Sequence, residues 1–583
     1  MRCIFSYEVL DGVNRHFRGL EKSPVKGNSS SSRTPSSRFS TSSNSSTKNI
    51  LYKSRWNSIE FYCYYIIIAV ALTACGLVMF SVSSPSHPGY YKFSKELSKG
   101  WMFGRKADVT DYQYSSFREA VILLFVLMGF YFLVKKIVLR CFSKSFGHKN
   151  VQSCYRFVFS LIFAFSAFGS GMLFVFAILL VNFSIAMIAK DSVLNPIITW
   201  TFNIIVLVCN ELYTGYSFAA IHPSLAKLDH MKGILQRWHV LFNLTTLRLI
   251  SFNLDYYWSL KSKETLKTFM ASKERSVESL TLRERMELSR EQHEYNFFNY
   301  ILYLFYAPLY LAGPIITFNN FMSQLEHPFK SNVPHRNLYY GIRMVLCMVL
   351  MELLLHFAYV NAIKNYGDWG YYNQVELCMI SFVLLFMTWL KLLIPWRVFR
   401  FWSLLDGIDP PENIIRCMCN NYSALGFWRA WHRSYNRWLV RYIYVPLGGK
   451  AHSLRNTFVV FTFVAFWHDL TLTLLCWGWL IVLFILPERL TVYVSYKIGL
   501  HKKPYFRIIS GIGYGLNILF MIICNLVGFA LGIDGSSQVL RELFLTQEGI
   551  KSLTIGWLLM YTGVQFMFEV RRGEEHQGLF LRC

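Results

Sequence analysis

Long blocks of apolar residues limit most strongly what this chain can fold into. A span across the ~30 Å hydrocarbon core of a bilayer needs ~20 such residues, and most of the blocks reach that length. They lie near residues 61–83, 119–139, 157–189, 197–209, 297–318, 339–362, 376–395, 456–487, 508–533 and 551–569. Since lipid offers the backbone no hydrogen-bond partners, such blocks form helices. The sequence therefore predicts an all-α polytopic membrane protein with roughly ten to twelve transmembrane helices.

Two of the blocks are longer than one span requires. Residues 157–189 include Gly169 and Gly171, which predicts two helices or a broken one. Residues 456–487 are long enough to tilt strongly or to bend. Interrupted helices are tolerated at membrane depth only where protein or a water-filled cavity satisfies the backbone.

The remaining segments set the domain organisation. Residues 1–56 include a Ser-rich, basic stretch with few apolar residues, so we expect a disordered tail there and no cleavable signal peptide. Residues 57–570 form the membrane domain. Within it, residues 226–296 are expected to form a charged hydrophilic loop with an exposed helix held by i,i+4 charge pairs. Residues 571–583 are expected to be a short C-terminal tail.

Charge and cysteine usage exclude several kinds of site. The formal net charge is +25, but Lys and Arg cluster in the tail and in loops, which indicates attraction to anionic lipid surfaces and not to nucleic acid. The thirteen cysteines are scattered, so the sequence predicts neither a disulfide framework nor a metal site. Orientation stays open, because the basic tail favours a cytosolic start whereas Asn-x-Ser sequons at Asn28 and Asn44 would suit a lumenal one.

The segment from residue 427 to residue 449 holds the first candidate site, because it combines aromatic and basic residues with a histidine and reads as one helix. Residues four apart share a helix face. By this spacing His432 and Asn436 form one row, and beside it lies a cationic ridge of Arg429, Arg433, Arg437 and Arg441. One face could then hold anionic groups while its neighbour presents an imidazole. The alternative is an interfacial helix whose Trp, Tyr and Arg side chains only anchor it among lipid headgroups.

His468 is the second candidate, because it lies in an uncharged hydrophobic run. Residues 458–486 contain no Lys, Arg or Glu. An ionisable group at membrane depth costs a few kcal/mol or more, so it usually has a function there. The alternative is a buried histidine that bonds to a backbone carbonyl or a hydroxyl. Trp431 and Trp467 each precede one of the two histidines, and we group them with the candidate substrate-binding residues.

These features resemble the membrane-bound O-acyltransferase (MBOAT) family. Residues 427–449 are similar to its Trp-Arg-x-Trp-His/Asn/Asp helix, which ends in Tyr-Ile-Tyr-x-Pro-Leu-Gly-Gly, and His468 falls at the family's downstream histidine. Residues 247–255 and 308–318 look like two further family signatures, so the resemblance covers about residues 57–570. Within the family, residues 100–118 resemble the first loop of the fungal glycerol-uptake (Gup) branch.

The resemblance implies a mechanism and a donor. Acyl-CoA would be a co-substrate with no bound cofactor, and the helices would surround an intramembrane cavity with broken, tilted and interfacial segments. His468 would act as general base on the attacking hydroxyl, within a catalytic region at residues 427–470. His432 or Asn436 would hydrogen-bond the oxyanion. The Hedgehog acyltransferases carry Asp at the position of His432 and His at that of Asn436, so the choice between the two stays open. The arginine ridge would bind the phosphates of coenzyme A.

The Gup branch also implies an acceptor. Its enzymes place a very-long-chain acyl group on the lyso form of the phosphatidylinositol in glycosylphosphatidylinositol (GPI) anchors, at the endoplasmic reticulum. We therefore expect a multi-pass protein of that membrane, with the plasma membrane as a second location and the oligomeric state open. Another lysophospholipid is an alternative acceptor. A polyol transporter and a catalytically silent regulator are alternative functions, although repeated transporter halves are not found and His468 is present.

Overall fold

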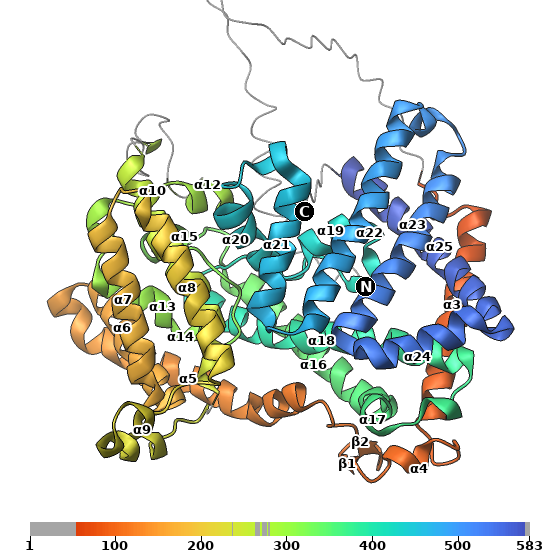
Figure 1. Ribbon diagram of the computed structural model, residues 1–583, viewed down its shortest axis with the longest axis horizontal. Coiled ribbons are helices and arrows are strands. Elements are labelled where there is room, and N and C mark those ends of the chain that lie inside the picture. Colours follow the sequence, from red (N-terminus) through yellow and green to blue (C-terminus); the bar gives the residue numbers. More distant parts are fainter. Residues whose placement is uncertain (1–53, 236, 263–268, 271–276, 278–279, 578–583) are drawn as a thin grey trace, which may run out of the picture.

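A computed structural model of the chain describes residues 54–577, apart from residues 236, 263–268, 271–276 and 278–279. The expected disordered tail lies outside the described residues except for its last three. The described part is largely helical (Figure 1). Its helices are α3 (Ile59–Val82), α4 (Tyr90–Phe93), α5 (Tyr112–Phe146), α6 (His148–Phe168), α7 (Gly171–Ala189), α8 (Leu194–Leu212), α9 (Phe218–Ile221), α10 (Trp238–Lys261), α12 (Leu282–Glu287), α13 (Phe297–Phe305), α14 (Ala307–Tyr310), α15 (Phe318–Glu326), α16 (Pro334–Phe357), α17 (Val360–Tyr366), α18 (Gln374–Leu405), α19 (Ala424–Ala430), α20 (Arg433–Leu439), α21 (Ser453–His468), α22 (Leu472–Lys497), α23 (Phe506–Asn525), α24 (Gly532–Leu545) and α25 (Gln547–His576).

The protein is an all-α, multi-pass membrane protein. Nine helices of the described part are long and apolar enough to cross a membrane, namely α3, α5, α6, α7, α16, α18, α22, α23 with its extension to Ala530, and α25. This number is below the ten to twelve predicted spans. One reason is α8, which has the length of a span but carries the buried polar residues Asn195, Asn203 and Asn210.

Both long apolar blocks are divided. Residues 157–189 form α6 and α7 with Gly169 between them at φ +56°, where a Cβ would lie 2.3 Å from the carbonyl oxygen of Met231. The prediction of two helices or a broken one is therefore confirmed. Residues 456–487 form two helices, α21 and α22, which pack against each other on either side of a short turn (Figure 1). Gly478 permits this contact, because a Cβ there would lie 3.1 Å from the carbonyl oxygen of Phe461.

The block at 297–318 is not a span. It forms the short helices α13 and α14 and an extended stretch before α15, almost all of it buried inside the protein. Arg248 of α10 compensates for the interruption, since its guanidinium donates to the carbonyl oxygens of Leu304 and Leu309, both at 2.6 Å. Backbone groups freed by a helix break at membrane depth are thus satisfied by protein.

The charged loop expected at 226–296 is wrong for its first half. Residues 238–261 form α10, a helix with fifteen buried residues that packs against α7 and α8. Its charged residues Arg248 and Asp255 point inward and are both buried. Further on, the segment expected as an exposed helix contains the short helix α12, in which Arg283 and Glu287 form an exposed i,i+4 ion pair at 2.7 Å while Arg285 and Met286 are buried.

The end of the chain is a helix and not a tail as far as it is described. α25 continues to His576. Glu574 is buried and accepts both guanidinium nitrogens of Arg416, at 3.0 and 2.8 Å. The C-terminal helix is therefore fixed to the segment that leads into α19.

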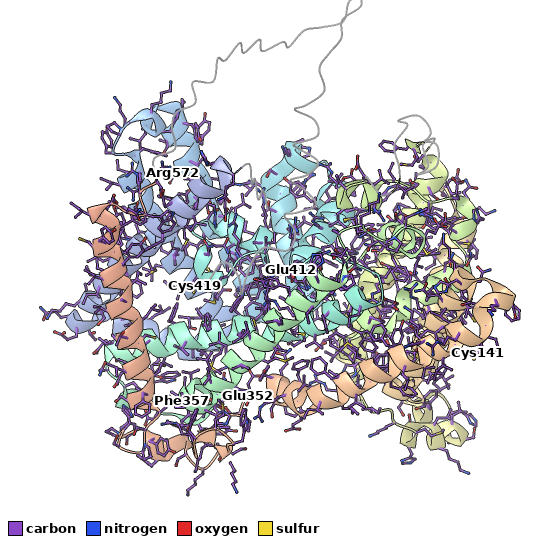
Figure 2. The ribbon with its side chains drawn as sticks, turned by 180° about the vertical axis from the view of Figure 1, so that it is seen from behind. Cys141, Glu352, Phe357, Glu412, Cys419 and Arg572 are labelled. Carbon is purple, nitrogen blue, oxygen red and sulfur yellow. The ribbon has the colours of Figure 1, made fainter. Side chains whose placement is uncertain are left out.

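The loop between α4 and α5 is the only described part with strands, and it docks on α16. Its two strands, β1 (Ser98–Lys99) and β2 (Lys106–Ala107), pair antiparallel. Glu352 of α16 accepts the indole N–H of Trp101 at 3.0 Å and the guanidinium of Arg118 at 2.6 and 2.9 Å. Figure 2 shows Glu352 at this edge of the molecule, far from the central Glu412.

Candidate active site

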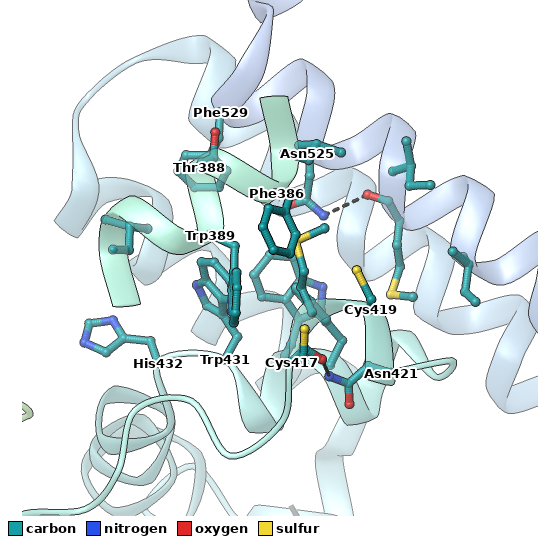
Figure 3. Close-up of a pocket in the computed structure, with 18 of the residues that line it drawn as sticks. Phe386, Thr388, Trp389, Cys417, Cys419, Asn421, Trp431, His432, Asn525 and Phe529 are labelled. Carbon is teal, nitrogen blue, oxygen red and sulfur yellow. Dashed lines mark hydrogen bonds between the residues drawn. The ribbon is translucent and has the colours of Figure 1, made fainter. Parts of the chain in front are cut away.

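A cavity of about 2180 Å³ occupies the middle of the bundle, between α18 to α21 and α23 to α25. Most of its wall is apolar. Six of the nine predicted site residues line it, namely Arg429, Trp431, His432, Asn436, Trp467 and His468. In Figure 3, His432 lies on one side of Trp389 and Trp431, and the polar side chains of Cys417, Cys419 and Asn421 lie on the other.

His432 sits at a helix break and not inside one helix. α19 ends at Ala430 and α20 begins at Arg433, and His432 between them has a left-handed backbone with φ +41° and ψ +50°. The prediction of a continuous helix from residue 427 is therefore wrong. The imidazole stacks on the indole of Trp396 from α18, with ring centroids 4.7 Å apart and planes inclined by 23°. The ring of Tyr435 also lies against the imidazole of His432, with the ring centroids 5.1 Å apart.

His468 is the last residue of α21 and reaches the same cavity. Trp467, next to it, is held by Asn243 of α10 through two reciprocal bonds: the indole N–H donates to the Asn243 carbonyl oxygen at 2.8 Å, and Asn243 Nδ2 donates to the Trp467 carbonyl oxygen at 3.1 Å. The Trp467 ring lies 4.8 Å from the ring of His468 and 6.2 Å from that of His432. One fixed indole therefore contacts both imidazoles.

His432 lies outside the nine membrane-spanning helices, and its surroundings keep it neutral. Burial first, and the nearby His468 second, lower the pKa of His432 to about 3. Burial disfavours the charged imidazolium, and a second positive charge nearby would disfavour it further. A neutral imidazole carries one N–H donor and one acceptor nitrogen.

The arginine ridge is not continuous. The break at His432 separates Arg429 from the other three arginines, and Arg429 alone of the four lines the cavity. Arg441 lies in a π-helical turn, Val440–Tyr444, and pairs with the buried Asp255 at 2.7 Å. Arg433 is buried as well. The predicted single cationic face therefore does not form.

Cations from other elements also line the cavity; Lys391, one of them, pairs with Asp111 at 2.6 Å, and Arg283, another, pairs with Glu287 at 2.7 Å. Lys450 and Arg489 line the cavity together with Arg429. Arg489 of α22 donates to Ser453 Oγ at 3.0 Å. Ser453 is the first residue of α21, and His468 is the last residue of the same helix. At 1.5 Å per residue the helix axis between these two ends is about 22 Å long. The cavity thus carries positive charge near one end of α21 and an imidazole at the other.

Trp396 and Asn243 belong to the site although sequence reasoning did not select them. Trp396 follows Pro395 inside a long apolar helix, and Asn243 precedes the family-like stretch 247–255. Their only local signals are a proline within a span and a polar residue in an apolar helix. No three His, Cys, Asp or Glu side chains gather into a metal site within the residues that the structure describes.

Comparison with known proteins identifies the family of this chain. Residues 225–531 match the model of the membrane-bound O-acyltransferase family. Membrane-bound O-acyltransferase gup1 of Schizosaccharomyces pombe is 50% identical to this chain over the whole of both proteins. Membrane-bound O-acyltransferase GUP1 of Saccharomyces cerevisiae is 40% identical over 91% of this chain and 94% of its own length. Protein-cysteine N-palmitoyltransferase HHAT of Mus musculus is 30% identical over 30% of this chain and 37% of its own. The chain therefore belongs to the MBOAT family, in its fungal Gup branch, and is an acyltransferase.

Proposed function

We propose that this protein transfers a very-long-chain fatty acyl group from acyl-CoA to the hydroxyl of a lyso-lipid within the membrane. The observation that carries the proposal is that two helix breaks direct His432 and His468 into one large apolar cavity. Such an apolar cavity would hold lipid chains and disfavour water next to a reactive thioester. A water-excluded site also strengthens the interactions that stabilise developing charge.

In the proposed reaction His468 is the general base. Its imidazole takes the proton of the acceptor hydroxyl as that oxygen attacks the thioester carbonyl. The tetrahedral intermediate then collapses, the carbon–sulfur bond breaks, and the coenzyme A thiolate receives the proton from the imidazolium. The products are an ester and free coenzyme A, and no covalent enzyme intermediate is needed.

We assign stabilisation of the oxyanion to His432, with Asn436 as the competing candidate. A neutral imidazole can donate its N–H to the developing negative charge. Stacking on Trp396 fixes the ring plane of His432. Asn436 closes the first turn of α20, since its N–H donates to the His432 carbonyl oxygen at 3.0 Å, and it lines the same cavity.

Arg429, Lys450 and Arg489 are the groups that we assign to the phosphates of coenzyme A. The donor carries its phosphates at one end of a long arm and its thioester at the other. For Lys450 and Arg489, near the start of α21, the distance of about 22 Å to His468 would separate the two ends in the same way. Arg429, three residues before His432, lies nearer to the imidazoles. Arg433, Arg437 and Arg441, which the sequence had favoured, do not line the cavity.

The acyl chain would lie along α25. One face of this helix lines the cavity from Ser552 to Val570, which corresponds to about 27 Å of helix. The chains of one bilayer leaflet fill only half of the ~30 Å hydrocarbon core, or about 15 Å. α3, which packs against α25, adds Ile68, Leu72 and Cys75 to the apolar wall. The length of this groove supports a very-long-chain acyl group.

The acceptor that we propose is the lyso-phosphatidylinositol moiety of GPI anchors, at the endoplasmic reticulum. This step rests on the resemblance to the Gup branch, since the names of the relatives specify O-acyl transfer and not the acceptor. Physically, a cavity at membrane depth suits an acceptor lipid that never leaves the bilayer.

The decisive test uses purified protein in detergent micelles. We expect it to convert a very-long-chain acyl-CoA and a lyso-GPI acceptor to diacyl product and free coenzyme A, and we expect lysophosphatidylinositol to react more slowly. His468→Ala should abolish the product. In parallel, sealed proteoliposomes should take up no labelled glycerol above empty vesicles. If glycerol uptake survived His468→Ala and no acyl product formed under any condition, the protein would be a transporter and the proposed acyl transfer would be refuted.

A further inference from the structure

The first turn of α20 is capped by a residue from a distant segment. Helices begin with N–H groups that lack a partner inside the helix, and the preceding side chain commonly accepts one of them. His432 occupies that position, but its side chain makes no capping bond. Instead the carbonyl oxygen of Asn413 accepts the N–H of Arg433 at 3.0 Å, and its Oδ1 accepts the N–H of Ser434 at 3.3 Å. The imidazole of His432 is thereby left to face the cavity.

The backbone of His432 needs such an external constraint. Left-handed conformations are rare for residues other than glycine, and they persist only where the surrounding structure holds them. Among the described residues three other non-glycine positions have a positive φ, and all three are exposed: Phe103, Lys190 and Thr214. His432 is the one that is buried. Solvent and side-chain adjustment cannot relieve the conformation there, so neighbouring groups must fix it.

Asn413 is itself held by a set of buried charges. It is fully buried and follows Glu412, whose carboxylate pairs with Arg400 at 3.1 Å. Arg400 also pairs with Asp409 at 2.7 Å, and Asp409 pairs with Arg336 of α16 at 2.8 Å. Figure 2 shows Glu412 near the centre of the molecule. Helices α16 and α18 therefore fix the position of the segment that caps α20.

A second contact from another segment holds the same turn of α20. Ser434 Oγ accepts the backbone N–H of Ile315, at 2.8 Å, from the extended stretch before α15. Ser434 is thus bound through its N–H by Asn413 and through its hydroxyl by Ile315. The two contacts restrain both the position and the rotation of the residues that follow His432.

We propose that Asn413 is a positioning residue for acyl transfer, which holds His432 in its left-handed conformation so that the imidazole meets the thioester carbonyl. The inference rests on the proposed role of His432. A catalytic group displaced by about 1 Å can lose ~10²-fold in rate. Asn413 contacts the backbone of α20 and does not line the cavity, so donor binding should not depend on it.

The test is a double-mutant cycle on the full-length protein in micelles. Asn413→Ala keeps the carbonyl that accepts the Arg433 N–H but removes the Oδ1 that accepts the Ser434 N–H, and it should lower kcat by about 10- to 100-fold with the KM for acyl-CoA unchanged. In a His432→Ala background it should cause no further loss. Asn337→Ala, which removes another buried amide on α16, should leave kcat unchanged and serves as the control.

Each result has a defined meaning. Parental kcat in Asn413→Ala, or an equal loss in both backgrounds, would overturn the positioning role. Parental activity in His432→Ala would instead refute the proposed role of His432 and leave acyl transfer by His468 intact. If Asn413→Ala cannot be purified, Ser434→Ala tests the same turn through its contact with Ile315, and a rise in KM without a fall in kcat would count against the inference.

Discussion

His432 and His468 carry different parts of the proposed reaction, although one indole ring contacts both. His468 ends a helix and His432 interrupts one, so each imidazole projects from a position where the regular backbone stops. Polar groups at such positions are costly in a membrane and are usually functional. The two residues should therefore respond differently to substitution.

We expect His468→Ala to lower kcat by at least the ~10²-fold typical of a general base, while the protein stays folded and embedded. His432→Ala and Asn436→Ala should separate the candidates for oxyanion stabilisation, with the larger loss for His432. His452→Ala, at an exposed histidine before α21, is the matched control. If His468→Ala turned over acyl-CoA and acceptor at nearly the parental rate, His468 could not be the general base.

The second residue-scale prediction concerns the donor. Arg429→Ala and Arg489→Ala should each raise the KM for acyl-CoA more than they lower kcat, because a phosphate contact is made equally in ground and transition states. Salt should weaken donor binding in the parent protein. Lys551→Ala, which removes an exposed cation paired with Glu548, should change neither constant. An unchanged KM in both arginine variants would exclude these cations from the donor site.

At the scale of elements, the cavity is lined both by short helices that end within its wall and by the long continuous helix α25. α19, α20 and α21 all end or begin inside the cavity wall, whereas α25 runs along it. Gly556 and Gly563 face the cavity on α25, and neither has a neighbouring atom within 4 Å of where a Cβ would lie. Larger side chains at these positions would project into the proposed acyl groove without a clash.

We therefore expect Gly556→Leu and Gly563→Phe to shift the preferred acyl-CoA toward shorter chains. Each methylene that no longer fits loses about 0.8 kcal/mol, or roughly fourfold in kcat/KM. The measurement is kcat/KM across a series of acyl-CoA chain lengths. Gly513→Leu on α23, an exposed glycine with equally open surroundings but outside the cavity, is the control. A uniform loss at every chain length would show that the groove holds something other than the chain.

At the scale of the whole molecule, long-range ion pairs join the parts of the chain that surround the cavity. Arg441 and Asp255 connect α10 to the turn after α20, and Arg416 and Glu574 connect α25 to the segment before α19. Both members of the second pair are buried. Removing one partner leaves an uncompensated charge, whereas replacing both does not.

Glu574→Ala should therefore destabilise the protein by about 3–5 kcal/mol, seen as a lower unfolding temperature in detergent. The double variant Arg416→Met with Glu574→Leu should recover most of that loss. Glu548→Ala, in an exposed pair on the same helix, should have little effect. An unfolding temperature of Glu574→Ala equal to that of the parent would mean that α25 is held by apolar contacts alone.

The sequence by itself determined the class of fold and the positions of the two histidines. Apolar blocks of span length leave a chain few choices in a bilayer, and local motifs identify His432 and His468 within it. Alternation between apolar and charged segments was less informative. It suggested a hydrophilic loop where α10 is buried. Arg248 and Asp255 can be buried in this helix because their partners lie more than fifty residues away in the sequence, where a local pattern cannot show them.

Only the tertiary structure decided how the site is built. An i,i+4 pattern predicts one face only while the helix continues, and the contacts of Asn413 and Ile315 that hold the break at His432 come from remote segments. The same break interrupts the arginine ridge, so that Arg429 alone of the four predicted arginines lines the cavity. Local sequence determines which residues favour a helix. The point at which a helix ends inside a membrane depends on which remote groups hydrogen-bond to its free backbone N–H and C=O groups.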